Sequence, residues 1–593
     1  MHPTSLLLSV CIGLSALSEA ATRIYDFNIT RLEANPDNAF KRSVIGINGQ
    51  WPIPTIMADV GDTVIVNVLN QLGDEDTSLH FHGLYQNGTN EMDGVAAVTQ
   101  CPIGPGSSFT YKFEVNQPGT YWYHSHNKGQ YPDGLRGPLI VNDPQSPFKK
   151  DYDEEIILTL SDWYHESVPL LLNKFMSRFN PTGAEPVPQA ALMNDRQNLD
   201  VKIEPGKTYL IRAINMGAFA AQYLWFEDHT MRVVEVDGIY HEPKEAKMLY
   251  ISAAQRYGFL LTTKNTTQQN HAFVSAMDTS LFDKVPDGLE SNVTGWLVYD
   301  EKKERLKPAL VDEFDPLDDF TLVPHDKERV LSQIDQSITL NVKMDNLDDG
   351  ANYAFFNDIS YRAPVVPTLY TALTSGSLAS NASVYGPYTN SIVLSKGEVV
   401  EVIINNMDKG KHPFHLHGHA FQLVYRSEEA AGSYIPGPSS SSSSATTDPA
   451  ATPMRRDTVL VHPNGHAILR FRADNPGVWL FHCHIEWHVS SGLMMTFVEA
   501  PHSLQRAYSK PDGSLTLPAD HLQACRERGI ATAGNPVGNT NDFFDFEGIP
   551  KPPDPLPAGF TTKGYVALVC SVLSAFLGMA TVVWYGSSEI VKK

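Results

Sequence analysis

Four short blocks of alternating histidines constrain the fold of this chain more than any other feature of its sequence. In one of them, Cys483 lies between His482 and His484, and His488 follows five residues after the cysteine. Successive side chains of a β-strand point to opposite faces, so Cys483 would point away from its two neighbours. The blocks are His80-Phe81-His82, His124-Ser125-His126, His412-Pro413-Phe414-His415-Leu416-His417 and His482-Cys483-His484-Ile485-Glu486-Trp487-His488. The chain must fold so that strands distant in sequence bring these blocks to shared centres.

The donors in these blocks indicate copper. Together they supply ten imidazoles and one thiolate. Imidazole with a single thiolate suits copper, and two histidines with one cysteine form the trigonal blue-copper site. Structural zinc favours closed sets of four ligands and would leave most of these donors unused. A chance cluster is the alternative in a chain with 21 histidines, but the repetition of the pattern in four blocks argues against it.

The four blocks resemble those of the multicopper oxidases, the family of laccases, ascorbate oxidases and ferroxidases. The resemblance implies four copper ions, with one-electron oxidation of a substrate at type 1 coupled to four-electron reduction of dioxygen to water at a trinuclear cluster. It assigns type 1 to His412, Cys483 and His488, type 2 to His80 and His415, and the type 3 pair to His82, His124, His126, His417, His482 and His484. His419 and Trp487 match no ligand, and we interpret His419 as structural.

The axial position of the type 1 site falls at Leu493 in the family spacing, ten residues after Cys483. A methionine there would be a weak sulfur ligand, whereas leucine donates nothing. Loss of the axial donor destabilises Cu(II) relative to Cu(I) and raises the reduction potential. Met494 and Met495 follow directly, so a shift of one residue in register would reverse this prediction.

Both ends of the chain carry apolar segments that predict a secreted protein with a membrane anchor. Residues 1–20 combine a short apolar run with a small-residue cleavage site, which is typical of a signal peptide. Residues 564–586 are the predicted membrane span. Their uncharged stretch, residues 565–585, would cover roughly 30 Å as a helix, about the thickness of a hydrocarbon core. A buried core helix is the alternative by length. A polar cytosolic tail at 587–593 favours a retained span over a cleaved lipid-anchor signal, and a Pro-rich stalk at 547–563 precedes the helix.

Glycosylation signals and cysteine usage agree with an extracellular location. Five Asn-x-Ser/Thr triplets are candidate glycan acceptors: Asn28, Asn87, Asn265, Asn292 and Asn381. Cys11 lies in the signal peptide, Cys570 in the membrane span and Cys483 in the copper site. Cys101 and Cys525 remain as one possible disulfide in an oxidising compartment, and related laccases imply that it ties the C-terminal extension to the first domain.

Apolar-polar alternation between Gly and Pro turns predicts an all-β body. The stretches after Gly61, Gly206 and Gly397 read alike, with a polar residue and then β-branched strand residues, which indicates three related sandwiches. Only the first and third lead to histidines, so we interpret the middle one as a spacer. The resemblance implies three cupredoxin-like Greek-key β-sandwich domains plus one C-terminal transmembrane helix. The predicted domains are 21–144, 145–301 and 302–546, the third with a low-complexity loop at 433–453.

The net charge of −22 argues against a nucleic-acid partner, because such proteins present a basic face. An acidic surface attracts cations, although simple solubility explains it equally well.

Three loop segments resemble those of the fungal plasma-membrane ferroxidases of high-affinity iron uptake. They are residues 180–186, 281–286 and 407–412. The resemblance implies that Glu185, Asp283 and Asp408 form the Fe(II) site, although only Asp408 is placed near copper by the sequence itself, four residues before His412. Carboxylates hold Fe(III) more tightly than Fe(II), which lowers the potential of the iron couple. The alternative is that each acid is a loop cap or a solvated charge.

Asp93 and Glu486 resemble the proton-handling carboxylates of the family. Asp93 follows the first histidine pair, and Glu486 lies between the type 3 ligands and His488. Dioxygen reduction consumes protons, and a buried carboxylate can relay them or orient a bound water. The alternatives are a turn residue before Gly94 for Asp93, and a hydrogen bond to a histidine for Glu486.

The sequence therefore predicts a single-pass type I membrane glycoprotein of the fungal plasma membrane that oxidises Fe(II) to Fe(III) with dioxygen. The resemblance implies an iron permease in the same membrane as partner, and a vacuolar membrane is the alternative location. A laccase acting on phenols or aromatic amines would share every copper ligand but needs an open apolar pocket at type 1. A non-catalytic copper-binding surface protein is the third candidate; degenerate ligands would mark it, and none of the eleven is missing.

Overall fold

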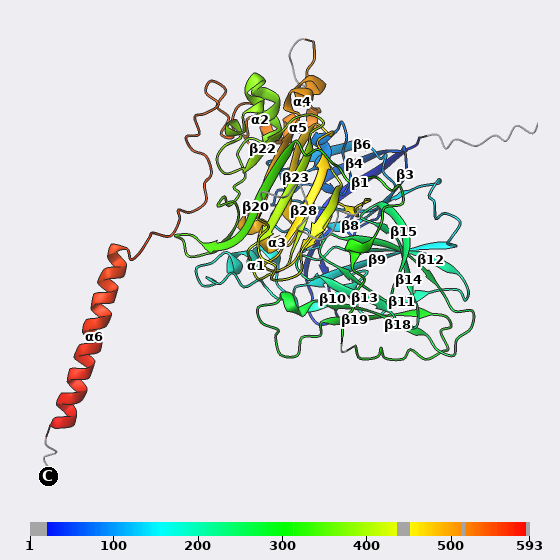
Figure 1. Ribbon diagram of the computed structural model, residues 1–593, viewed down its shortest axis with the longest axis horizontal. Coiled ribbons are helices and arrows are strands. Elements are labelled where there is room, and N and C mark those ends of the chain that lie inside the picture. Colours follow the sequence, from blue (N-terminus) through cyan, green and yellow to red (C-terminus); the bar gives the residue numbers. More distant parts are fainter. Residues whose placement is uncertain (1–19, 312, 436–450, 512–515, 589–593) are drawn as a thin grey trace, which may run out of the picture.

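The computed structural model of the protein describes residues 20–311, 313–435, 451–511 and 516–588. Nearly all of the predicted signal peptide, most of the predicted low-complexity loop and residues 589–593 of the predicted tail lie outside these ranges. Within them the body is built of β-strands, and one long helix, α6 (Thr562–Ser587), projects away from it (Figure 1). The predicted all-β class is confirmed as a mostly-β body, and the predicted C-terminal transmembrane helix as an apolar helix that could span a membrane.

Three sandwiches of two sheets each follow one another along the chain. The first has the strand orders β2-β1-β4-β6 and β3-β8-β7-β5, the second β10-β9-β12-β17-β14-β15 and β11-β19-β18-β13-β16, and the third β21-β20-β23-β28-β25-β26 and β22-β30-β29-β24-β27. The predicted divisions after residues 144 and 301 fall in the links between these sandwiches and stay predictions as domain boundaries.

The strands of the first sandwich are β1 (Thr22–Ala34), β2 (Arg42–Ile47), β3 (Ile56–Asp59), β4 (Thr63–Asn70), β5 (His80–His82), β6 (Ser108–Glu114), β7 (Gly119–His124) and β8 (Arg136–Asn142). Those of the second are β9 (Glu154–Trp163), β10 (Ala190–Met193), β11 (Leu199–Lys202), β12 (Thr208–Asn215), β13 (Gln222–Phe226), β14 (Met231–Val236), β15 (Ile239–Ala246), β16 (Met248–Ile251), β17 (Arg256–Thr262), β18 (His271–Met277) and β19 (Asn292–Val298). Those of the third are β20 (Gln336–Asn346), β21 (Asn352–Phe356), β22 (Ser391–Leu394), β23 (Val399–Asn406), β24 (His412–Leu416), β25 (Phe421–Arg426), β26 (Arg455–Arg456), β27 (Thr458–Val461), β28 (His466–Arg472), β29 (Gly477–Cys483) and β30 (Met494–Glu499).

Strand pairing confirms the internal repeat expected from the sequence. β4 pairs parallel with β1 and antiparallel with β6. β12 does the same with β9 and β17, and β23 with β20 and β28. Burial along β4 alternates residue by residue, as its apolar-polar pattern predicts. One face of this strand therefore enters the core while the other stays near solvent.

The C-terminal extension returns to the first sandwich. After β30, helix α4 (Pro501–Tyr508) and helix α5 (Ala519–Glu527) contribute Leu504 and Cys525 to the apolar core of that sandwich. Cys525 forms the predicted disulfide with Cys101, joining positions 424 residues apart. Cys483 is free and buried, and Cys570 is free and exposed.

Helix α6 has the length and composition of a membrane anchor. It runs for 26 residues, an 18-residue stretch within it has a mean hydropathy of 2.3, and none of its side chains is buried against the body. The stalk before it is not free along its whole length. Asp348 N donates to Asp554 O at 2.8 Å, and Leu347 pairs with Pro555, so the stalk is held against the turn between β20 and β21.

Four of the five predicted glycan acceptors lie at accessible positions. Asn87, Asn265, Asn292 and Asn381 are exposed, whereas Asn28 is half-buried in β1. Glycosylation of these residues stays a prediction.

Candidate metal centres

Two pairs of antiparallel strands bring the histidine blocks together. β5 pairs with β7 so that His80 lies opposite His124, and β24 pairs with β29 so that His415 lies opposite His482. Because side chains alternate along β29, Cys483 points to the face opposite His482. The predicted division of the blocks between two centres follows from this pairing.

An outer centre lies where Cys483 meets His412 and His488. Cys483 Sγ lies 3.6 Å from His412 Nδ1 and 3.4 Å from His488 Nδ1, and all three side chains are buried. Burial raises the pKa of the thiol, but the two imidazoles, His488 first, lower it to about 7. A thiol this close to its thiolate form, with two imidazole nitrogens beside it, is a donor set for a soft metal ion.

An inner cluster collects the other eight histidines. Most form overlapping groups whose nitrogens lie within 4.8 Å of one another: His80 with His82 and His124, His80 with His415 and His417, and His126 with His417 and His482. His484 stands beside them, with its ring centroid 5.0 Å from that of His82 and 5.4 Å from that of His124. The structure thus brings together every predicted copper ligand.

The chemistry of this cluster fits bound metal. Several buried nitrogens have no hydrogen-bond partner among the described residues: His80 Nε2, His82 Nδ1, His124 Nε2, His415 Nε2 and both nitrogens of His484. Burial, together with the neighbouring imidazoles, lowers the pKa well below its usual value at His124, His417, His482 and His484. Neutral imidazoles with unpartnered lone pairs are costly to bury, and a metal ion satisfies them.

Asp93 is placed between two of these histidines by a glycine turn. Its carbonyl oxygen accepts a hydrogen bond from His80 Nδ1 at 2.7 Å, and its Oδ2 lies 2.9 Å from His417 Nδ1. Gly94 follows with φ of 85°, and a Cβ there would lie 1.7 Å from Leu79 O. Only glycine lets this turn approach β5 so closely. Asp93 is therefore more than a turn residue, because it orients two rings of the cluster.

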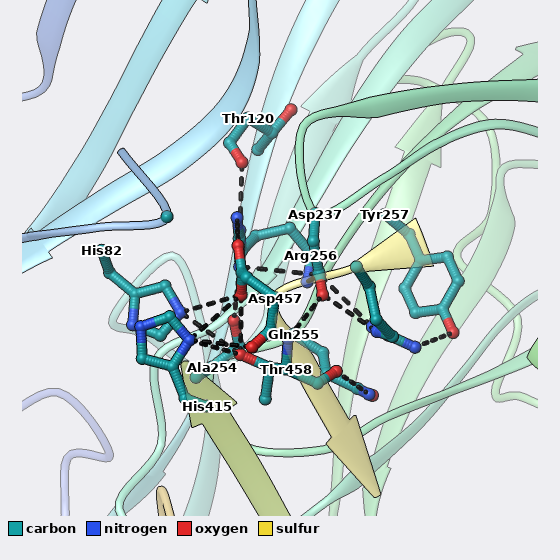
Figure 2. Close-up of polar contacts among 12 residues, drawn as sticks. His82, Thr120, Asp237, Ala254, Gln255, Arg256, Tyr257, His415, Asp457 and Thr458 are labelled. Atoms are coloured by element: carbon teal, nitrogen blue, oxygen red, sulfur yellow. Dashed lines mark hydrogen bonds and ion pairs between the residues drawn. The ribbon is translucent and has the colours of Figure 1, made fainter. Parts of the chain in front are cut away.

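One carboxylate at the cluster, Asp457, was not predicted from the sequence. Its Oδ1 lies 3.3 Å from His82 Nε2 and 3.3 Å from His415 Nδ1. Burial would raise its pKa, but Arg256 and the two histidines hold it well below the usual range (Figure 2). No spacing to the histidine blocks marks Asp457, which follows two arginines. Arg256 belongs to the second sandwich, so that sandwich contacts a residue of the inner cluster, and its predicted role as a spacer stays a prediction.

Leu493 is buried, and its backbone is hydrogen-bonded to two residues of the outer centre. Its carbonyl oxygen accepts from Cys483 N at 3.2 Å, and its own N–H donates to His488 O at 2.9 Å. Met494 and Met495 already belong to β30. The backbone contacts agree with the predicted register, and the axial role of Leu493 stays a prediction.

Two of the three acids predicted to bind substrate contact histidines of the outer centre, and the third lies near enough to them for their charges to affect its pKa. His488 Nε2 lies 2.8 Å from Glu185 Oε1, and His412 Nε2 lies 3.0 Å from Asp408 Oδ2. Each carboxylate thus engages the ring nitrogen that faces away from the thiol. Asp283 is exposed, and its pKa is raised by partial burial and by the charges of Glu185 and Asp408. The three acids therefore lie within electrostatic reach of one another at the surface.

A cavity of about 940 Å³ joins the inner cluster to solvent. Buried His124 and His482 line it together with the exposed side chain of Asp74. Glu486 also lines the cavity, and burial raises the pKa of its carboxyl to about 8. In the described part of the chain its side-chain hydrogen bond comes from Ser490 Oγ at 3.1 Å and not from a histidine. Glu486 thus lies on the wall of a cavity that reaches the inner cluster, and its proton-handling role stays a prediction.

Three features together define a copper-dependent oxidoreductase. They are the sandwich fold, the centre of one cysteine and two histidines, and the histidine cluster at the end of a cavity. Multicopper oxidase family models match residues 28–146, 154–302 and 361–503. The chain belongs to the multicopper oxidase family.

Similar proteins align with nearly the whole length of this chain. The iron transport multicopper oxidase fetC of Epichloe festucae is 58% identical over 573 residues, covering 97% of this chain and 90% of that protein. The iron transport multicopper oxidase FET3 of Saccharomyces cerevisiae is 45% identical over 597 residues, covering 99% and 92%. The crystal structure of Fet3p, a multicopper oxidase that functions in iron import, superposes with a TM-score of 0.86 at 44% identity, covering 90% of this chain and 100% of that one. A laccase from Botrytis aclada superposes with a TM-score of 0.73 at 30% identity, covering 86% and 92%.

Proposed function

We propose that this protein is a membrane-anchored ferroxidase that oxidises Fe(II) to Fe(III), with dioxygen as electron acceptor, in iron uptake. The observation that carries the proposal is the pair of carboxylates, Glu185 and Asp408, bonded to the outward nitrogens of His488 and His412. The two relatives named as iron transport multicopper oxidases support it, at 58% and 45% identity.

Four copper ions are proposed, held by the residues that the resemblance assigns. Type 1 takes His412, Cys483 and His488, type 2 takes His80 and His415, and the type 3 pair takes His82, His124, His126, His417, His482 and His484. When bound, these ions supply one-electron transfer at the outer centre and four-electron reduction of dioxygen to water at the inner cluster. Leu493 provides no axial donor, which would raise the reduction potential of the outer centre.

Glu185, Asp408 and Asp283 would bind the ferrous substrate. Their oxygens are hard donors that hold Fe(III) more tightly than Fe(II), so the site favours loss of an electron from iron. Glu185 and Asp408 also contact His488 and His412 at 2.8 and 3.0 Å. An electron leaving the iron therefore has a path through one carboxylate and one hydrogen bond to a ligand of the outer centre.

The chain itself joins the outer centre to the inner cluster. Cys483 is covalently bonded through the backbone to His482 and His484, and His482 Nδ1 donates to Cys483 O at 2.7 Å. The cavity would admit dioxygen and release water, and Glu486 on its wall would pass on the protons that the reduction consumes. Asp93 would hold His80 and His417 in place during turnover.

The membrane location and the partner complete the proposal. Helix α6 would anchor the enzyme in the plasma membrane with its sandwiches outside, and a vacuolar membrane is the alternative. An iron permease in the same membrane would accept Fe(III) before it hydrolyses.

A laccase activity on phenols is the second candidate, because a laccase shares the fold at 30% identity. Steady-state kinetics with Fe(II) and with a phenol, on wild type and on the double variant Glu185→Ala, Asp408→Ala, separate the two. We expect kcat/KM for Fe(II) to fall about 10- to 100-fold, since two charged hydrogen-bonding groups are removed, while phenol turnover stays close to wild type. Asp287→Ala removes an exposed acid from the Asp283 loop and serves as the control. Equal losses on both substrates, or no loss on either, would contradict the iron site.

A further inference from the structure

We propose that Arg256, a buried arginine of the second sandwich, is a positioning residue for the inner histidine cluster and acts through Asp457. The proposal goes beyond the ferroxidase function, because it concerns histidines that any substrate of this enzyme would depend on. Its basis is a chain of contacts that crosses all three sandwiches.

The first link is Asp457, which selects the free nitrogen of two stacked histidines. The rings of His82 and His415 stack with centroids 3.7 Å apart. Asp457 Oδ1 lies 3.3 Å from His82 Nε2 and 3.3 Å from His415 Nδ1. The opposite nitrogens, His82 Nδ1 and His415 Nε2, have no hydrogen-bond partner within the described ranges. Asp457 therefore turns a different nitrogen of each ring into the cluster. Its carboxylate contacts His82, whereas at His415 its backbone carbonyl oxygen also lies 3.0 Å from Nδ1.

His82 depends on this carboxylate more than its neighbours do. Backbone carbonyl oxygens, at 2.7 to 3.0 Å from Nδ1, orient four other histidines of the cluster: His80, His124, His415 and His482. The hydrogen bonds of the His82 ring, over the residues that the structure covers, go to the side chains of Asp457 at 3.3 Å and Thr458 at 3.4 Å. A backbone carbonyl is fixed by its strand, whereas a carboxylate can rotate. The orientation of the His82 ring therefore depends on the orientation of the Asp457 carboxylate.

The second link is Arg256, which fixes the plane of the Asp457 carboxylate. Nη1 donates to Oδ1 at 2.8 Å and Nη2 donates to Oδ2 at 2.6 Å, a bidentate pair that leaves no rotational freedom. The guanidinium is held in turn by Thr120 O, at 3.0 Å from Nε, and by Ala254 O, at 3.3 Å from Nη1. Figure 2 shows Arg256 lying between Thr120 on one side and Asp457 with the two histidines on the other.

The pair also packs directly against the segment that carries His82. A Cβ placed on the next residue, Gly83, would lie 2.5 Å from Arg256 Nη2 and 2.9 Å from Asp457 Oδ2. Without the guanidinium, Asp457 would be a buried carboxylate lacking its cation. The Thr458 hydroxyl, at 2.8 Å from Oδ1, would remain but does not fix the carboxylate plane as the bidentate pair does. We therefore expect loss of Arg256 to disturb copper at the inner cluster and to leave the outer centre intact.

The test compares Arg256→Met with Arg212→Met in the purified, copper-loaded enzyme. Arg212 is a matched control. It is a buried arginine of the same sandwich that donates to Thr120 Oγ1 at 2.9 Å and to Glu235 at 3.0 Å, and among the described residues it forms no hydrogen bond or ion pair with Asp457. The readouts are copper per chain, the type 2 EPR spectrum, the blue type 1 absorption and the rate of copper loss to a chelator. Arg256→Met should lose inner copper about 10- to 100-fold faster, with an altered type 2 spectrum and unchanged blue absorption. Arg212→Met should match wild type in all four.

Two further variants keep the proposal testable if Arg256→Met does not fold. Arg256→Lys keeps the charge without the bidentate fork, and it should also alter the type 2 spectrum. Asp457→Asn should do the same, and adding Arg256→Met to it should change nothing more, because the arginine acts through Asp457. Wild-type spectra and copper retention in the folded Arg256 variants would overturn the proposal. Equal effects in Arg212→Met, or additive effects in the double variant, would also overturn it.

Discussion

At the scale of single residues, the partner of each imidazole decides what that ring can bind. At the outer centre the two inner nitrogens face the thiol of Cys483, while the outer nitrogens of His412 and His488 face carboxylates. Burial would raise the pKa of Asp408, but the hydrogen bond from His412 holds it below the usual range. The surface beside this centre is therefore anionic, which suits a metal cation better than a neutral phenol.

Leu493→Met should lower the reduction potential of the outer centre, because it introduces a weak axial sulfur donor that stabilises Cu(II). Each ~59 mV of decrease makes a one-electron transfer from iron tenfold less favourable. Redox titration of the blue absorption measures the shift. Met495→Leu removes a sulfur from the neighbouring β30 and should leave the potential unchanged. If Met495→Leu shifted the reduction potential and Leu493→Met did not, the predicted register would be wrong.

At the scale of elements, loops of two sandwiches surround the proposed iron site. An ion pair ties them together, with Lys411 Nζ at 2.6 Å from Asp278 Oδ2. Asp278 caps the short helix η2 (Thr279–Leu281), which leads to Asp283, and Lys411 directly precedes β24. Burial would raise the pKa of Asp278, but Lys411, Ser280 and Tyr250 hold it below the usual range. The pair positions the two loops and neutralises a cation near the proposed iron site.

Asp278→Asn should therefore raise KM for Fe(II) about 3- to 10-fold, or ~1 kcal/mol, because Lys411 would be left as an uncompensated positive charge. KM for a phenol should not change. The double variant Asp278→Asn, Lys411→Met removes both charges, and steady-state assays should show its KM for Fe(II) returning toward wild type. A double variant as impaired as the single one would mean that the loops had moved, and that charge was not the cause.

At the scale of the whole molecule, two long-range connections organise the sandwiches. The disulfide between Cys101 and Cys525 closes the chain over 424 residues and fastens α5 to the first sandwich. The stalk before α6 meets the turn between β20 and β21. The last residue of β20, Asn346, also donates to Pro181 O at 2.8 Å, so the same turn contacts the loop that leads to Glu185. The turn between β20 and β21 thus contacts both the stalk before the membrane anchor and the loop that leads to the proposed iron site.

Replacing Cys101 and Cys525 by serine should destabilise the protein by about 2–5 kcal/mol, because the unfolded chain loses a long covalent constraint. The midpoint of thermal unfolding, measured at one fixed scan rate, should fall while the blue absorption of the folded enzyme is kept. Cys570→Ser removes the exposed free cysteine of α6 and should not change the midpoint. An unchanged midpoint in the double variant would argue against a stabilising disulfide.

Much of the fold and of the outer centre could be predicted from local patterns. The three related sandwiches are visible after Gly61, Gly206 and Gly397, and strand pairing confirms the repeat. The histidine pairs could be found because two residues on one face of a strand are always two positions apart. Glu185 and Asp283 required the resemblance, since nothing in their own loops places them near copper.

The amino-acid sequence by itself predicted copper, its candidate donors and the strand period, because donor types and the alternation of side chains are local properties of a strand. Only the tertiary structure decided the supports of the inner cluster. Asp457 meets His82 across 375 residues and Arg256 across 201, and Asp93 reaches His417 across 324. A buried charge is stable only beside a partner, and the fold decides which residue lies close enough to be that partner. No local sequence pattern shows which residue this is.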